Sequence, residues 1–98
     1  MLSVEDIKAV IEPIVRDTEV EKIVLFGSYA KGNASKDSDI DLYLSSNGVI
    51  TGLNFYDLKS RFENAFEPEI ELLPDLDIIP NSPLEKHIYE TGVVVYER

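Results

Sequence analysis

The sequence predicts an α/β (α+β) fold in which a mixed sheet of about four strands carries helices packed mostly on one face. Helical and strand-like segments alternate along the chain in the order α-β-α-β-α-β-α-β, which favours one sheet with helices against it. Apolar residues recur at spacings of three and four in the longer helical segments. Glycine, proline and asparagine separate the segments. The 98 residues fit a single domain, residues 1–98.

The first helix is expected over residues 4–17, where apolar side chains recur at helical spacing. Ser3 is placed to cap it, and Asp6 stands three residues later in a capping-box-like position. Pro13 lies inside this segment and is expected to kink or shorten the helix. Residues 20–26 end in a continuous apolar run, which is typical of a buried strand.

A short helix is expected after Ser28, and Gly32 is expected to end it. In residues 39–44 apolar and polar side chains alternate. This alternation predicts a half-buried strand with Asp39 and Asp41 on its open face.

The second half of the chain continues the alternation. A polar loop is expected over residues 45–52, followed by an amphipathic helix over 53–66, a strand over 69–73, a helix over 84–89 and a strand over 93–96. Three aromatic residues of the longer helix recur at helical spacing and are expected in the core: Phe55, Phe62 and Phe66.

Composition and charge restrict the possible functions. There is no cysteine, so disulfides and zinc–thiolate sites are excluded. The formal net charge is −10, from 19 acidic and 9 basic residues, which disfavours non-specific nucleic-acid binding and favours basic partners and cations. Glu5, Asp6 and Lys8 interrupt the first apolar run, unlike a signal peptide, and no apolar stretch is long enough to span a membrane. We therefore expect a cytoplasmic protein.

The most informative motif is Gly27-Ser28 followed, after ten residues, by Asp39-Ile40-Asp41. A turn of small residues can present backbone N–H groups to phosphate oxygens. Two acids one residue apart on a strand point the same way and repel each other unless a cation lies between them, and their hard oxygen atoms suit Mg²⁺. The motif therefore predicts chemistry on a nucleoside triphosphate, with Asp39 and Asp41 as metal ligands.

Other residues near the motif have two interpretations each. Lys31 either pairs with phosphate oxygens as a point charge or is an ordinary surface lysine. Ser38 hydrogen-bonds either its own loop or a phosphate. Lys36 is a weaker candidate for the phosphate role. His87, the only histidine, is expected to be a surface or structurally satisfied residue.

A two-metal phosphoryl-transfer site commonly uses a third carboxylate. Glu71 should point opposite Ile70 and Leu72, two apparent core residues, and so could face the acids of the neighbouring strand. Asp75 and Asp77 are alternatives, although Pro74 is expected to end the strand before them.

Residues 26–44, FGSYAKGNASKDSDIDLYL, resemble the signature of the DNA-polymerase-β-like nucleotidyltransferase superfamily, and more narrowly the minimal nucleotidyltransferases (MNT). The likeness extends over nearly the whole chain and includes a terminal strand like Gly-Val-Val-Val-Tyr at residues 92–96. It implies a polymerase-β-like nucleotidyltransferase fold.

The resemblance also implies Mg²⁺-dependent transfer of a nucleoside monophosphate, with ATP as the expected donor, to an acceptor hydroxyl. It places Gly27 and Ser28 on the triphosphate and Asp39 and Asp41 on the metals. Two positions depart from the family pattern. Lys31 stands where arginine is frequent, and Glu71 stands where aspartate is usual.

Many minimal members resemble antitoxins paired with an all-helical HEPN ribonuclease, and some transfer AMP to a tyrosine of that toxin. The leading hypothesis is therefore a protein adenylyltransferase acting on a HEPN-type toxin, with a homo- or hetero-oligomer possible. A catalytically weak antitoxin that neutralises its partner by occlusion is the main alternative. Nucleotidylation of a small molecule such as an aminoglycoside is a third.

Overall fold

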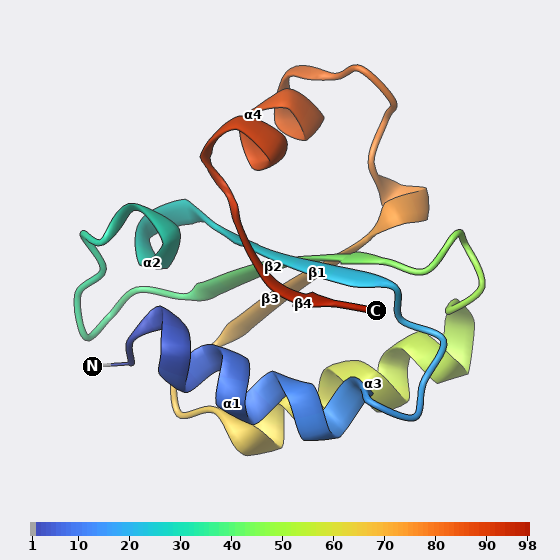
Figure 1. Ribbon diagram of the computed structural model, residues 1–98, viewed down its shortest axis with the longest axis horizontal. Helices are drawn as coiled ribbons and strands as arrows, with labels where there is room; N and C mark the ends of the chain where they lie inside the picture. The colour runs from blue at the N-terminus through green and yellow to red at the C-terminus, as the bar shows by residue number, and fades with distance from the viewer. Residues whose placement is uncertain (1) are drawn as a thin grey trace.

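The computed structural model describes residues 2–98. A four-stranded sheet has the order β3-β2-β1-β4, in which β1 is antiparallel to β2 and β4, and β2 is parallel to β3 (Figure 1). The mixed sheet is as predicted. The elements are α1 (Val4–Val15), β1 (Lys22–Phe26), α2 (Gly27–Lys31), β2 (Ile40–Ser45), α3 (Gly52–Ala65), β3 (Ile70–Pro74), the 3₁₀ turn η1 (Asp75–Asp77), α4 (Pro83–Thr91) and β4 (Val93–Glu97).

The two longest helices, α1 and α3, cover one face of the sheet, whereas α4 lies over the other (Figure 1). The main core lies under α1 and α3 and includes Ile11, Leu42 and Phe62, all with no exposed surface. A smaller apolar cluster lies under α4, formed by Val24, Phe26, Tyr43, Ile78 and Ile88. The expectation of helices mostly on one face therefore holds for the long helices, and α4 is the exception.

The ends of α1 follow local chemistry. Ser3 and Asp6 form the expected capping box, in which each side chain accepts a hydrogen bond from the other residue's backbone N–H. Pro13 lies within the last turn, and α1 ends at Val15, two residues before the predicted boundary. Beyond it, the Thr18 hydroxyl donates to the Val15 carbonyl and Thr18 thereby starts the turn into β1.

The turn after β1 is shorter than a typical strand-to-helix connection, because α2 begins at Gly27 itself. Gly32 ends α2 in the left-handed conformation with a φ of 76°, as predicted. The later elements agree with the predicted ranges to within two residues. Within residues 2–98, no helix is long and apolar enough to cross a membrane.

Candidate active site

The parallel pairing of β2 and β3 brings two predicted acids together. Asp41 and Glu71 are direct partners in the register, so their side chains leave the same face of adjacent strands. Ile40 and Leu42 point to the opposite face and are fully buried, which holds β2 in this register. The structure thus places Glu71 where strand alternation predicted it, on the face that α4 partly covers.

Gly27 lies against the Asp41 carboxylate. Phe26 pairs with Asp41 across the antiparallel β1–β2 ladder, and Gly27 follows with a φ of +73°. A Cβ atom built on Gly27 would lie 2.2 Å from Asp41 Oδ2, a contact that no side chain could make. The positive φ favours glycine here, and a side chain at position 27 would displace the Asp41 carboxylate.

The acids form a region of concentrated negative charge. Burial raises the pKa of Asp41, and the nearby charges of Glu71 and Asp39 raise it further. Within residues 2–98, none of these three carboxylates accepts a hydrogen bond or joins an ion pair of the protein. A bound cation would relieve this repulsion.

The donor set fits Mg²⁺ together with a phosphate. In the described part of the chain, no three acid, histidine or cysteine side chains are already assembled into a metal-binding group. Mg²⁺ sites that act on nucleotides often use one or two carboxylates and take further oxygen ligands from the substrate phosphates and water. Asp41 and Glu71, in register on neighbouring strands, supply carboxylates of that type, and Asp39 precedes β2 as a further candidate.

The residues predicted to contact phosphate differ in exposure and in hydrogen bonding. Ser28 is half-buried in α2, one residue after Gly27, whereas Lys31 is exposed in the last turn of the same helix. The Ser38 hydroxyl accepts a hydrogen bond from the Ser35 backbone N–H at 2.9 Å. This bond agrees with the loop-binding interpretation of Ser38.

Asp75 lies at the other end of β3 and has a different environment. Its Oδ2 accepts hydrogen bonds from the backbone N–H groups of Ser46 and Gly48, at 2.9 and 3.1 Å. Pro74 is the last residue of β3, so Asp75 and the exposed Asp77 follow in η1. Asp75 therefore holds the loop after β2 and lies at the other end of β3 from Glu71, so Glu71 remains the candidate for the third acid.

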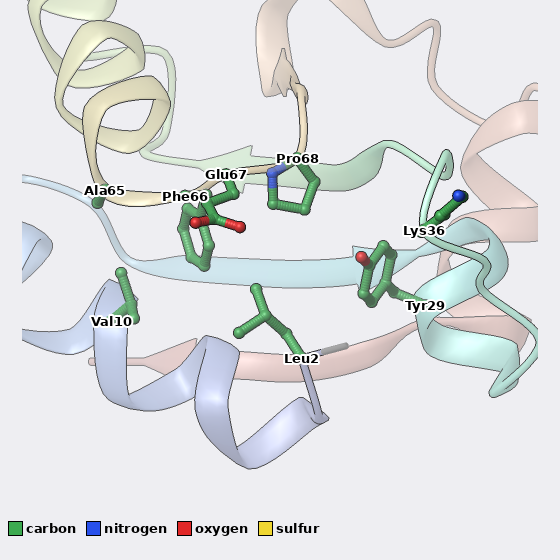
Figure 2. A pocket seen from close by; sticks show the side chains of 8 residues that line it. All are labelled: Leu2, Val10, Tyr29, Lys36, Ala65, Phe66, Glu67 and Pro68. Carbon is green, nitrogen blue, oxygen red and sulfur yellow. The ribbon is translucent and has the colours of Figure 1, made fainter.

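A pocket of about 630 Å³ lies on the opposite side of the sheet, between α1, α2 and the end of α3. Figure 2 shows Tyr29 and Phe66 on either side of it, with Leu2 between them. Lys36 also lines this pocket, which weakens its candidacy for the phosphate role. The walls of the pocket come from segments far apart in the chain, so no local sequence pattern predicts it. His87 is partly buried in α4.

Comparison with known proteins gives both a family match and similar solved structures. A family model described as "Polymerase beta, Nucleotidyltransferase" matches residues 8–98. A provisionally named protein adenylyltransferase of Methanocaldococcus jannaschii is 33% identical over 55 residues, which are 56% of this chain and 64% of that protein. The protein adenylyltransferase MntA of Thermococcus cleftensis is 27% identical over 77 residues, covering 74% of this chain and 78% of that protein. The chain thus spans a little under two thirds of the Methanocaldococcus relative.

Solved structures share the fold. A toxin–antitoxin complex with AMP-PNP superimposes with a TM-score of 0.78 at 20% identity, covering 93% of this chain and 73% of that one. A complex of a tri-AMPylated Shewanella oneidensis HEPN toxin with its MNT antitoxin gives a TM-score of 0.69 at 18% identity, covering 93% and 70%. At these identities, the likeness establishes the arrangement of helices and strands.

Proposed function

The chain belongs to the polymerase β nucleotidyltransferase family, and on that premise we propose that it transfers AMP from ATP to a hydroxyl group of a protein partner. One observation carries the proposal. The Asp41 carboxylate lies between the Gly27 backbone and the strand position of Glu71, with no partner among the described residues to neutralise it. Such a region is suited to a divalent cation and the phosphates that accompany it.

Each residue of the site has a proposed task. Asp39 and Asp41 would hold Mg²⁺, and Glu71 would complete the ligand set. When bound, the cation supplies charge neutralisation for the phosphates and lowers the pKa of the acceptor hydroxyl. Gly27 leaves room for a phosphate to approach the backbone, and the Ser28 hydroxyl and N–H can donate to its oxygens. Lys31 is a further candidate to neutralise phosphate charge.

The transfer forms one bond and breaks another at the α-phosphorus. The acceptor oxygen bonds to this phosphorus, and the bond to the bridging oxygen of the β-phosphate breaks, so that pyrophosphate leaves. The acceptor proton passes to a base, and a Glu71 carboxylate oxygen is the candidate because Glu71 is exposed and in register with Asp41.

We propose a HEPN-type toxin as the acceptor protein. Two relatives are named protein adenylyltransferases, and similar solved structures are toxin–antitoxin complexes, one of them with a tri-AMPylated HEPN toxin. The net charge of −10 agrees with a basic protein as partner. The cytoplasmic location stays a prediction from the sequence.

The test uses ATP labelled at the α-phosphate, Mg²⁺ and a HEPN-type protein as the candidate acceptor. We expect label and the mass of AMP to appear on that protein, and chelation of Mg²⁺ to prevent this. The double variant Asp39→Asn, Asp41→Asn should be inactive. Asp37→Asn is the matched control, because Asp37 is an exposed acid of the preceding loop whose side chain has no partner among residues 2–98.

The same experiment separates the second candidate function. Glu71, in place of the usual aspartate, is the feature that favours an antitoxin acting by occlusion. Tight binding of the HEPN-type protein with no label transfer would support occlusion and contradict the transferase proposal. In a parallel reaction with an aminoglycoside added, label on the aminoglycoside but not on the protein would support a small-molecule acceptor.

A further inference from the structure

We propose that the acceptor protein docks on an exposed apolar surface around α4, and that its contact face is basic. We call this the α4 surface; its residues are Leu76, Ile79, Leu84, Tyr89 and Val94, which are between 43% and 74% exposed. The inference rests on the proposed function, since it names where the acceptor of that reaction is held. Exposed apolar side chains gathered on one face are typical of interaction sites.

The α4 surface lies on the same face of the sheet as the acids. Ile88 anchors α4 in the apolar cluster that contains Phe26, and Phe26 is the direct partner of Asp41 in the β1–β2 ladder. Val94 pairs with Val24 of the same cluster, which places the exposed part of β4 on this face too. A protein seated on α4 can therefore extend an acceptor hydroxyl toward Asp41 without crossing the sheet (Figure 1).

The charge around this surface identifies the kind of partner. Residues 75–97 carry five acids and a single lysine, Lys86. Among the described residues of this segment, Glu97 is the one acid in an ion pair, with Lys22 at 3.9 Å. Asp75 and Glu85 accept backbone hydrogen bonds, whereas the exposed Asp77 and Glu90 have neither a hydrogen bond nor an ion pair among the described residues. Apolar side chains among such acids complement a basic face with an apolar centre. A second copy of this chain is disfavoured, because two such surfaces would repel each other.

The remaining exposed apolar side chains provide an internal control. Val49, Leu53 and Tyr56 are at least 50% exposed but belong to α3 or the loop before it. Helix α3 covers the face of the sheet that lacks the acids (Figure 1). A protein docked there would be separated from Asp41 by the sheet, so this second group should not hold the acceptor.

The experiment measures binding of the HEPN-type protein to the full chain by calorimetry or surface plasmon resonance. The double variant Ile79→Ser, Leu84→Ser should weaken binding at least tenfold, whereas Leu53→Ser, Tyr56→Ser should leave it within twofold. Glu90→Lys on α4 should weaken binding several-fold and reduce its dependence on salt, and Glu63→Lys on α3 is the matched charge control. Amide hydrogen exchange of the wild-type complex should show protection in residues 76–94, a readout that does not depend on the folding of any variant.

The outcomes separate this inference from the proposed function. Loss of binding in the α3 variants with wild-type binding in the α4 variants would overturn the docking site while transfer still stands. Protection from amide hydrogen exchange that is confined to α3 would also overturn the α4 docking site. Binding on α4 without label transfer would support the docking site and overturn the proposed activity. A wild-type chain that does not bind the HEPN-type protein at all would overturn the docking inference.

Discussion

The two ends of the β2–β3 pair carry acidic residues in opposite environments. At one end, the backbone N–H groups of Ser46 and Gly48 donate to Asp75. At the other end, Asp41 and Glu71 are partners in the register, and Gly27, which has no side chain, lies against the Asp41 carboxylate. The Asp75 carboxylate therefore stabilises the fold. Asp41 and Glu71 have no hydrogen-bond or ion-pair partner among the described residues.

This difference distinguishes a structural acid from a candidate catalytic acid. A carboxylate that accepts hydrogen bonds from fixed backbone donors stabilises a loop, and its removal leaves those donors unsatisfied. Carboxylates that repel one another without donors destabilise the protein until a cation binds. Substitutions at the two ends should therefore affect different measurements, one stability and the other catalysis.

The sharpest test of the catalytic end is neutralisation of the paired aspartates. Asp39→Asn and Asp41→Asn should each lower the transfer rate by about 100-fold or more, equivalent to roughly 2.7 kcal/mol in the activation barrier. The reason is loss of a charged metal ligand at the reacting phosphate. Circular dichroism should show an unchanged fold. Near wild-type transfer by either variant at saturating Mg²⁺ would show that the metal assignment is wrong.

Glu71 tests whether the catalytic end extends to β3. Glu71→Gln should lower kcat by about 100-fold, within the range for loss of a general base. Nucleotide affinity should change little, because Gly27 and Ser28 are unaltered. Single-turnover transfer and nucleotide titration measure the two quantities. A variant with altered affinity and unchanged kcat would remove Glu71 from the chemistry.

At the structural end, Asp75→Ala should lower the free energy of unfolding by about 2 kcal/mol, because two partly buried N–H groups lose their acceptor. A loss of this size corresponds to a decrease in Tm of roughly 10 °C for a domain of this length. Asp77→Ala is the control, since Asp77 is exposed in the same turn. Loss of transfer activity at low temperature in folded Asp75→Ala would break the proposed division between the two ends.

The smallest expected effect is on the stability of the metal-free protein. Because the pKa of Asp41 is raised above its ordinary value of 3.8, the native state gains a proton there at higher pH than the unfolded chain does. The Asp41 charge therefore lowers stability at neutral pH, and this loss disappears as the pH falls through the raised pKa. Asp41→Asn should thus have a higher Tm than the wild type at pH 7 in EDTA. The difference in Tm between the two proteins should become smaller at acidic pH.

Magnesium binding should also change the thermal stability of the protein. Millimolar Mg²⁺ should raise the wild-type Tm by mass action and by relief of repulsion, and should have little effect on the double variant Asp39→Asn, Asp41→Asn. Thermal melts with and without ATP measure both responses. An equal shift in the double variant would place the cation elsewhere on the protein.

Strand alternation predicted the shared face of Asp41 and Glu71, and the register of β2 with β3 agrees with it. Asp39 was expected on the same strand but precedes β2, which begins at Ile40. The catalytic roles of the three acids stay predictions. The face chosen by α4 did not follow from the sequence, since a nine-residue amphipathic helix can pack on either side of a sheet. The structural role of Asp75 could not be predicted either. It depends on the conformation of a loop that lies 27 to 29 residues away in sequence.

The in-register parallel pairing of Asp41 with Glu71 also limits how this site can evolve or be redesigned. Positions on one face of a strand recur only every second residue, about 6.6 Å apart, so an acid cannot be moved gradually along β3. A shift of one residue would bury it in the core. The remaining freedom is side-chain length at position 71, where exchange between aspartate and glutamate changes the reach by about 1.5 Å. Fine adjustment of the third acid is thus confined to a single methylene group.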